Sequence, residues 1–168
     1  MENENIDKTS LVNKFNTIIK EKKNLLISII LSIIIILIIL FGHNYIQNKK
    51  NEQIAEKFIR GGLYLSSKDL VNSKLIYEEI VRSKNKFYSP LALNEIIENN
   101  LEKNNDKIID FFLVIEKINL DKDQNDLMKL KKALFLIKIS RETEGKKILD
   151  EIVKDNSIWK EIALEILK

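Results

Sequence analysis

Apolar and polar positions follow two different patterns, which meet near residue 44. Residues 25–41, LLISIILSIIIILIILF, carry no charge, and Ser28 and Ser32 are their only polar residues. In a helix these apolar residues would cover the whole circumference. At about 1.5 Å per residue the run would extend about 26 Å, close to the roughly 30 Å of a bilayer's hydrocarbon core. With interfacial residues on either side, the pattern predicts a membrane-spanning helix over residues 24–46.

Two other interpretations of this run are a buried core helix and the apolar region of a cleaved signal peptide. The rest of the chain is too small to surround a helix that is apolar on every side. A signal peptide has an apolar region of only about 7 to 15 residues and a small-x-small cleavage site. Here the run is longer, a long leader precedes it, and residues 42–44 offer no such site. We therefore expect an uncleaved anchor.

Lysine residues near the run predict its orientation, because positive charge favours the cytoplasmic side of a span. The flanking lysines are Lys14, Lys20, Lys22 and Lys23 before the run and Lys49 and Lys50 after it. We expect residues 1–23 in the cytoplasm and, in a bacterium, residues 47–168 in the periplasm. Residues 10–23 are amphipathic, which predicts either a helix on the inner leaflet or a cytoplasmic extension of the anchor.

Beyond residue 44, apolar residues recur at helical spacing, and no stretch alternates with the period of a strand. The whole chain has one Pro and four Gly, so few residues interrupt helices. An all-α domain is expected. Its helices are a continuation of the anchor to residue 65, the ranges 70–82, 89–101, 107–118, 126–140 and 144–154, and a last helix that Asn156 or Ser157 caps and that ends at Lys168.

Several local features of these helices can also be predicted. Ser89 is the expected cap of the helix that Pro90 opens, because serine suits a cap and proline suits a first turn. Residues 119–125 are expected to form the longest loop. The apolar positions expected to be buried include Leu75 in the 70–82 helix and, in the 126–140 helix, Leu127, Leu130, Leu134 and Ile137.

Composition and motifs argue against several classes of function. The formal net charge is +3, with acidic residues interleaved among lysines, so no basic stripe suits nucleic acid. The chain has no Cys, and its one His, His43, is expected at the membrane interface. No catalytic or phosphate-binding motif occurs, and DKDQND at 121–126 lacks the Gly and terminal Glu of a calcium loop. We expect no enzyme activity, cofactor, metal or small-molecule substrate.

Part of the helical region shows the spacing of a tetratricopeptide repeat. Gly61 and Tyr64 stand at its small and aromatic positions on a first helix, and Ser73 and Tyr77 stand at those of a second helix. The glycine and serine would let two helices approach closely. A local helix kink at Gly61 is the alternative. Later hairpins match less well: the second has Ile97 and Asn100 at the Gly and Tyr positions, and the third, with Gly145, agrees in length and phase.

In its layout, the chain resembles the YfgM-like tetratricopeptide-repeat proteins of proteobacterial inner membranes. The resemblance rests on the lysine-bearing leader, the single span, the segment FIRGGLYLSSKDLVNSKLIYEEIV, a second hairpin around KNNDKIIDFF, and a late helix SIWKEIALEIL. It implies an ancillary subunit of the Sec translocon whose repeat domain lies in the periplasm and works beside chaperones on emerging polypeptides. Two departures are the degenerate second repeat and a final helix that either caps the array or begins an uncompleted hairpin.

The leading functional hypothesis is a membrane-anchored protein-binding module in which the first helices of the hairpins line a concave surface. The alternative is a cell-envelope assembly or division scaffold that oligomerises through the same repeats. Partners under the first hypothesis are Sec translocon subunits and periplasmic chaperones. Repeat positions place the expected partner-binding residues at Ala55, Phe58, Ile59, Asn94, Glu98, Ile137 and Arg141.

Overall fold

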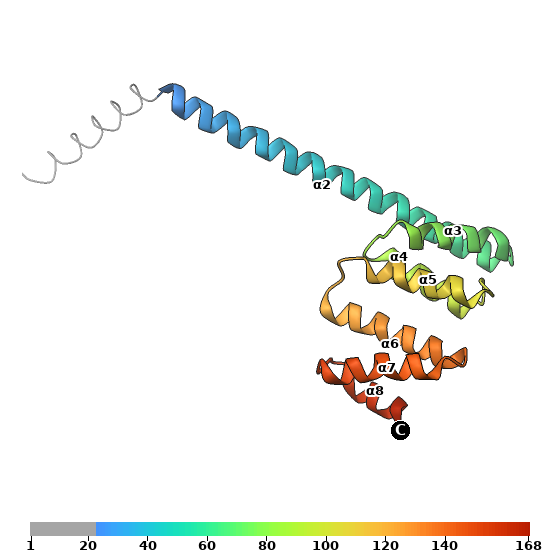
Figure 1. Cartoon of the computed structure of the whole chain (residues 1–168). Coiled ribbons are helices and arrows are strands. Elements are labelled where there is room, and N and C mark those ends of the chain that lie inside the picture. The colour runs from blue at the N-terminus through green and yellow to red at the C-terminus, as the bar shows by residue number, and fades with distance from the viewer. Residues whose placement is uncertain (1–22) are drawn as a thin grey trace, which may run out of the picture. The chain divides into compact units, whose positions relative to one another are not determined.

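The computed structural model describes residues 23–168, whose regular elements are all helices (Figure 1). The chain divides into two units, Met1–Lys50 and Asn51–Lys168. The all-α class predicted from the sequence is confirmed for the described residues. Residues 10–22 of the expected amphipathic segment lie outside them.

Helix α2, Lys23–Ser66, contains the long apolar run. Every side chain that is described between residues 24 and 50 is exposed, and the Ser32 hydroxyl donates to the carbonyl oxygen of Ser28 at 2.9 Å. Among the described residues, α2 is the one helix long and apolar enough to cross a membrane. The prediction that the apolar helix continues to about residue 65 is confirmed. The side chain of His43 is not among those described.

Six further helices follow in the second unit, and each packs on the next (Figure 1). They are α3 Leu70–Arg82, α4 Tyr88–Glu98, α5 Asn105–Glu116, α6 Lys122–Lys138, α7 Glu142–Lys154 and α8 Lys160–Leu167. Because the connections are short, consecutive helices pair as hairpins. Residues 51–66 of α2 pair with α3, α4 with α5, and α6 with α7, and α8 follows.

Residues in the left-handed region of backbone space end five of the described helices. They are Lys68, Lys84, Asn100, Ser140 and Asn156, with φ between 49° and 64°. After four of them the next backbone N–H donates to a carbonyl oxygen five residues earlier, as from Leu101 to Ile96 at 3.0 Å and from Arg141 to Leu136 at 2.8 Å. This bond occupies carbonyl groups that the end of a helix leaves free.

The start of α4 differs from the prediction. Asn85, not Ser89, supplies the side chain that precedes the helix, because its Oδ1 accepts hydrogen bonds from the backbone N–H of Phe87 at 3.0 Å and of Tyr88 at 2.9 Å. Ser89 is fully buried, and its hydroxyl donates to the carbonyl oxygen of Ile80 at 2.7 Å. The expected serine cap is therefore wrong: Ser89 joins α4 to α3.

The expected long loop at 119–125 is also wrong. Asp121 caps α6 by accepting a hydrogen bond from the backbone N–H of Gln124 at 2.8 Å, so the helix begins four residues before its predicted start. Asp126, expected as the first residue of this helix, lies inside α6 and is 4% exposed. The longest connection between described helices is 99–104, within which Glu102 is buried.

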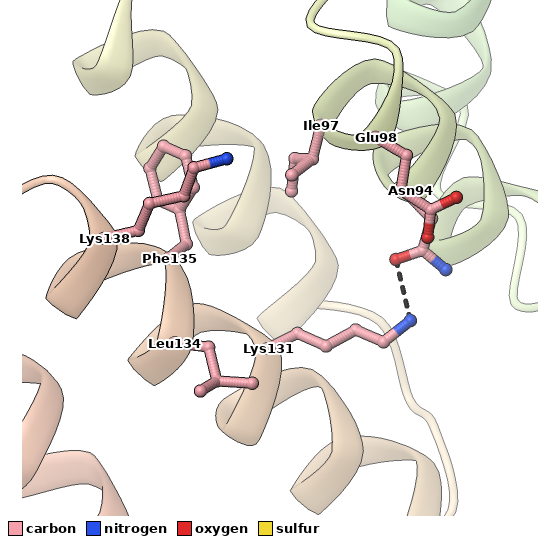
Figure 2. Close-up of a pocket in the computed structure, with 7 residues that line it drawn as sticks. All are labelled: Asn94, Ile97, Glu98, Lys131, Leu134, Phe135 and Lys138. Carbon is pink, nitrogen blue, oxygen red and sulfur yellow. Dashed lines mark hydrogen bonds between the residues drawn. The ribbon is translucent and has the colours of Figure 1, made fainter. Parts of the chain in front are cut away.

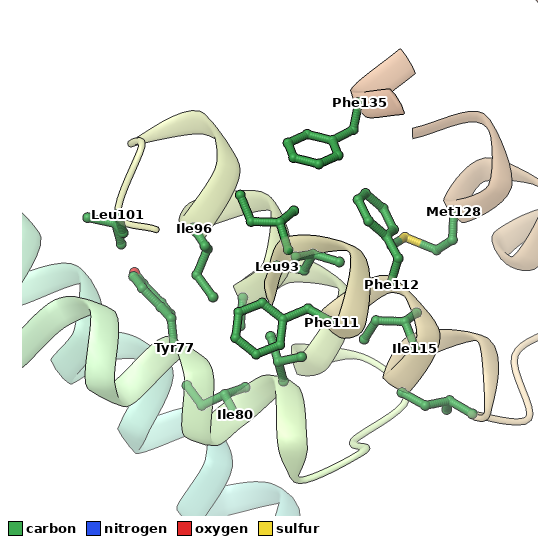
Figure 3. Close-up of a cluster of buried hydrophobic side chains, with 14 residues drawn as sticks. Tyr77, Ile80, Leu93, Ile96, Leu101, Phe111, Phe112, Ile115, Met128 and Phe135 are labelled. Carbon is green, nitrogen blue, oxygen red and sulfur yellow. The ribbon is translucent and has the colours of Figure 1, made fainter. Parts of the chain in front are cut away.

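The larger hydrophobic cluster fills the space between α3, α4, α5 and one side of α6. Figure 3 shows Phe111 of α5 among side chains from α3 and α4, and Phe112 beside Met128 and Phe135 of α6. A second cluster joins α6 to α7 and α8 through Leu130, Ala133, Leu149, Ile152 and Ala163. Helix α6 therefore packs on two sides.

Two apolar positions expected to be buried are exposed. Leu75 is 59% exposed because α3 directs Ser73, Tyr77 and Ile80 inward and Leu75 lies on the remaining face. Leu134 is 43% exposed because it lies on α6 between the residues that pack on α5 and those that pack on α7.

The first and third hairpins share one close contact. In the first, the buried Ser73 hydroxyl donates to the carbonyl oxygen of Gly61 at 3.0 Å. In the third, a Cβ added to Gly145 would lie 2.7 Å from the carbonyl oxygen of Ala133. Gly61 and Ser73 are twelve residues apart, and so are Ala133 and Gly145. The third hairpin therefore resembles the first both in length and in the close contact between its helices.

Candidate protein-binding groove

The structure distributes the seven residues expected to bind a partner over several surroundings. Ala55, Phe58 and Ile59 lie on α2, where Phe58 packs on Tyr77 and Tyr88 with ring centroids 5.4 Å and 5.6 Å apart. Ile59 is 64% exposed. Phe58 therefore belongs to the margin of the core.

The remaining four lie on or beside later helices. Ile137 packs into the interface of α6 with α7, and Arg141 forms a bidentate ion pair with Glu144 in which both distances are 2.6 Å. Asn94 and Glu98, which are neighbours on α4, line one cavity. The structure thus brings together two of the seven expected residues.

The cavity that contains Asn94 and Glu98 lies between α4 and α6 and has a volume of about 190 Å³ (Figure 2). It opens between the first helices of the second and third hairpins. Its lining combines apolar and charged side chains, which are those of Asn94, Ile97, Glu98, Lys131, Leu134, Phe135 and Lys138.

A second cavity, of about 230 Å³, continues along the same two helices toward their N-terminal ends. It shares Asn94 and Lys131 with the first cavity. Its other lining residues are mostly apolar and comprise Lys86, Phe87, Pro90, Leu91, Leu120, Gln124, Leu127 and Met128. Because the two cavities meet at one pair of residues, we treat them as a single feature, the α4–α6 groove.

The floor of the α4–α6 groove is continuous with the core. Met128 and Phe135 line the groove and are also members of the larger hydrophobic cluster, and the rings of Phe135 and Phe112 lie 6.0 Å apart. Helix α5 thus supports the groove from below through Phe112. Side chains held by a packed core form a preformed surface, which lowers the entropic cost of binding.

One hydrogen bond crosses the groove. The Lys131 ammonium donates to Asn94 Oδ1 at 2.8 Å, as Figure 2 shows. Burial lowers the pKa of Lys131, while the negative charge of Glu98 acts in the opposite direction. Lys86 and Lys138 stand toward opposite ends of the groove, so three lysines and one glutamate supply its charge.

Chemically, the groove offers hydrogen-bond donors and acceptors, a net positive charge and apolar side chains. Within residues 23–168 no three His, Cys, Asp or Glu residues gather where they could share a metal ion. Asp121 is occupied as a cap, and Asp126 is buried in α6. The arrangement suits recognition of another molecule's surface.

Sequence reasoning missed Lys131 and the α6 side of this groove. The signal was present, because Leu127, Lys131, Leu134 and Lys138 recur at helical spacing on one stripe of α6. The same spacing also predicts Leu127 and Leu134 as core positions. Leu130 and Ala133 form the buried face of α6 that packs on α7 and α8. The helix therefore packs in the core through residues other than Leu127 and Leu134.

Comparison with known proteins identifies no relative: no family model, curated protein or solved structure matches the chain.

Proposed function

We propose that this chain is a non-catalytic protein-binding module that α2 anchors in a bacterial inner membrane. The observation that carries the proposal is the α4–α6 groove, a preformed, mixed apolar and charged cleft between the first helices of two hairpins. Grooves between stacked helical hairpins are a recurrent place for binding segments of other proteins.

We propose that the hairpins form a tetratricopeptide-like arrangement, and equivalent small residues in two hairpins support this. Gly61 with Ser73 and Ala133 with Gly145 put small residues at equivalent close approaches in two hairpins. The inward residues that follow, Tyr77 in one hairpin and Leu149 in the other, are both four positions later. In such arrays each hairpin buries its face on its neighbours, and the first helices line the binding surface.

The cellular role we propose is that of an ancillary subunit of the Sec translocon. The lysine excess before the span favours a cytoplasmic N-terminus and a periplasmic helical domain. There the domain would assist contact between emerging polypeptides and periplasmic chaperones. A membrane anchor raises the local concentration of a module beside a channel, so a weak and permissive groove suffices. The alternative is a cell-envelope assembly or division scaffold.

Site-specific photocrosslinking tests this proposal in the full-length protein. A photoreactive residue at Leu134, in the groove, should crosslink to translocon subunits, chaperones or emerging polypeptides. The same residue at Asp150, exposed on α7, is the matched control. Crosslinks from Leu134 to division or outer-membrane assembly proteins, or to a second copy of the chain, would favour the scaffold. Equal products from both positions would contradict a groove-based function.

A further inference from the structure

We propose that the α4–α6 groove binds an extended segment of a partner protein. In that segment an internal Asp or Glu lies beside Lys131, with one large apolar residue two positions before it and another two positions after it. This inference rests on the proposed binding function and specifies its ligand. Three properties of the groove carry it: an ammonium group at its centre, apolar cavities on both sides of that group, and a positive charge toward each end.

The central ammonium group calls for an anionic partner. Most partly buried lysines elsewhere in the domain pair with carboxylates, for example Lys107 with Glu78 at 2.7 Å and Lys132 with Glu116 at 2.6 Å. Lys160, which donates to Asn156 Oδ1 at 3.3 Å, is an exception. Within residues 23–168, Lys131 has no carboxylate within 4.0 Å and donates to the neutral amide of Asn94. A carboxylate from a partner would supply the charge-assisted hydrogen bond that the domain's own residues do not.

The acidic residue is internal because the groove continues on both sides of Lys131. On one side Ile97, Leu134 and Phe135 line the smaller cavity, and on the other side Phe87, Leu91 and Leu127 line the larger one. A carboxylate at a chain terminus would leave one cavity empty. Phe87 is 63% exposed and Leu134 43% exposed, so an apolar side chain entering either cavity would cover surface that is otherwise in water.

The length and the spacing of the segment follow from helix and strand geometry. From residue 124 to residue 138, α6 extends about 21 Å at about 1.5 Å per residue. An extended chain of about six or seven residues covers that distance at about 3.3 Å per residue. Side chains two positions apart in an extended chain point the same way, which gives the pattern apolar, any residue, acidic, any residue, apolar.

Charge at the ends of the groove adds to this preference. Lys86 stands toward one end and Lys138 toward the other, and Glu98 is the one acidic residue in the lining. A segment with further acidic residues outside its apolar positions would meet both lysines. Basic segments would meet three ammonium groups and bind poorly.

A fluorescence anisotropy titration tests the proposal on the full-length protein in nanodiscs of phosphatidylcholine. The probe is a labelled peptide, Ser-Leu-Ser-Glu-Ser-Leu-Ser, and its control replaces Glu with Gln. We expect the Glu peptide to bind about tenfold or more tightly. In Lys131→Gln protein this preference should disappear while the Gln peptide keeps its affinity. Lys131→Arg should retain the preference, and Leu134→Ser should weaken both peptides.

Matched controls separate the groove from general charge and from unfolding. Lys117→Gln removes an exposed lysine at the end of α5 and should change neither affinity. Helix content by circular dichroism should be the same in every variant. Equal binding of the two peptides, or an unchanged preference in Lys131→Gln, would overturn the proposal, as would absence of binding up to about 1 mM.

A lipid surface is the other anion that the groove could meet. If Lys131→Gln weakens binding to phosphatidylglycerol vesicles but no peptide binds, the groove recognises membrane and the proposal is wrong. Crosslinking from Leu134 distinguishes an error in the proposed ligand chemistry from an error in the proposed binding function. Partner crosslinks without a peptide preference would overturn the ligand chemistry alone, whereas loss of both would also overturn the binding module.

Discussion

Gly61 and Gly145 each lie in a close contact between the two helices of a hairpin. A Cβ on Gly61 would lie 2.9 Å from Cε1 of Tyr77, which is 1% exposed. A Cβ on Gly145 would lie 2.6 Å from Cγ1 of Ile137 and 2.7 Å from a backbone oxygen. We expect Gly61→Ala and Gly145→Ala each to lower the free energy of unfolding by about 1 to 3 kcal/mol, as overpacking does. Urea denaturation measures both.

Gly62 is the matched control, because its added Cβ would meet only the Tyr77 hydroxyl at 3.6 Å, an ordinary contact. Gly62→Ala should raise the free energy of unfolding by up to about 1 kcal/mol through helix propensity. Gly145→Ala should cost more than Gly61→Ala, since a backbone atom must move. Equal midpoints for all three variants would contradict the close-approach argument and would favour the alternative of a kink at Gly61.

Glu102 ties the connection between α4 and α5 to α3. Its Oε1 accepts hydrogen bonds from the backbone N–H groups of Lys103 and Asn104, both at 2.8 Å, and its Oε2 lies 2.8 Å from Lys74 and 3.1 Å from Lys107. The hydrogen bond from Lys74, followed by that from Asn104, lowers the pKa of Glu102 to about 2. A carboxylate in these surroundings favours the folded state only while it is ionised.

The lowered pKa of Glu102 makes the stability of the fold depend on pH. An unfolded Glu titrates near 4.3, so the contribution of Glu102 is fully present above about pH 5 and is lost as the pH falls toward 2. Glu102→Gln should cost about 1 to 3 kcal/mol at pH 7 and flatten the acid side of the stability curve. Urea midpoints between pH 7 and pH 2.5 give both values. Parallel curves for wild type and variant would show that Glu102 does not set this dependence.

Individual residues were predictable where their surroundings are local. Gly61 and Ser73 stand out in the sequence because a small residue inside a helix needs a packing reason. Ser89 was misassigned, since a serine before a proline suits a cap, and only the packing of α4 on α3 reveals its bond to Ile80. Lys131 was missed because its role depends on Asn94, 37 positions away.

At the scale of elements, helix ends were predicted well where a single side chain fixes them. The predicted bounds of α3 agree with those observed, and Asp69 caps it by accepting a hydrogen bond from the backbone N–H of Asn72. The start of α6 was predicted too late because several Asp and Asn residues there could each cap a helix, and Asp121 is the one that does. Competing caps cannot be ranked without the packing of the first turn.

Residues with positive φ at the ends of helices allow a prediction about glycine substitution. Lys84 ends α3 with φ of 55°, where a Cβ costs about 1 to 2 kcal/mol relative to glycine. Lys84→Gly should therefore raise the free energy of unfolding by about 1 kcal/mol. Asn100, with φ of 51°, is the control, because asparagine tolerates this region and Asn100→Gly should gain less. Thermal denaturation compares the two. A larger gain at Asn100 would contradict the strain argument.

At the scale of the molecule, the sequence predicted the helical hairpins but not the groove between them. Hairpins follow from local periodicity and turn residues, which lie close together in the chain. The α4–α6 groove requires the relative placement of two helices, to which the contact between Phe112 of α5 and Phe135 of α6 contributes. Two of the seven expected binding residues, Asn94 and Glu98, lie in it because both are on α4, one of the two helices that form it.

The orientation of the whole chain in a membrane is the last prediction. More lysines precede the apolar run than follow it at a comparable distance, so the N-terminus should stay in the cytoplasm. In a bacterial host, a reporter that is active only in the periplasm should be active when fused after Lys168 and inactive when fused after Lys23.

Replacing Lys14, Lys20 and Lys22 with Gln should lower the activity of the Lys168 fusion, because the charge difference that retains the N-terminus would be removed. Replacing the exposed Lys147 and Lys154 of α7 is the control and should change nothing, since they lie far from the run along the chain. Activity of the Lys23 fusion alone would place the helical domain in the cytoplasm, and the proposed contact with emerging polypeptides in the periplasm would then be wrong.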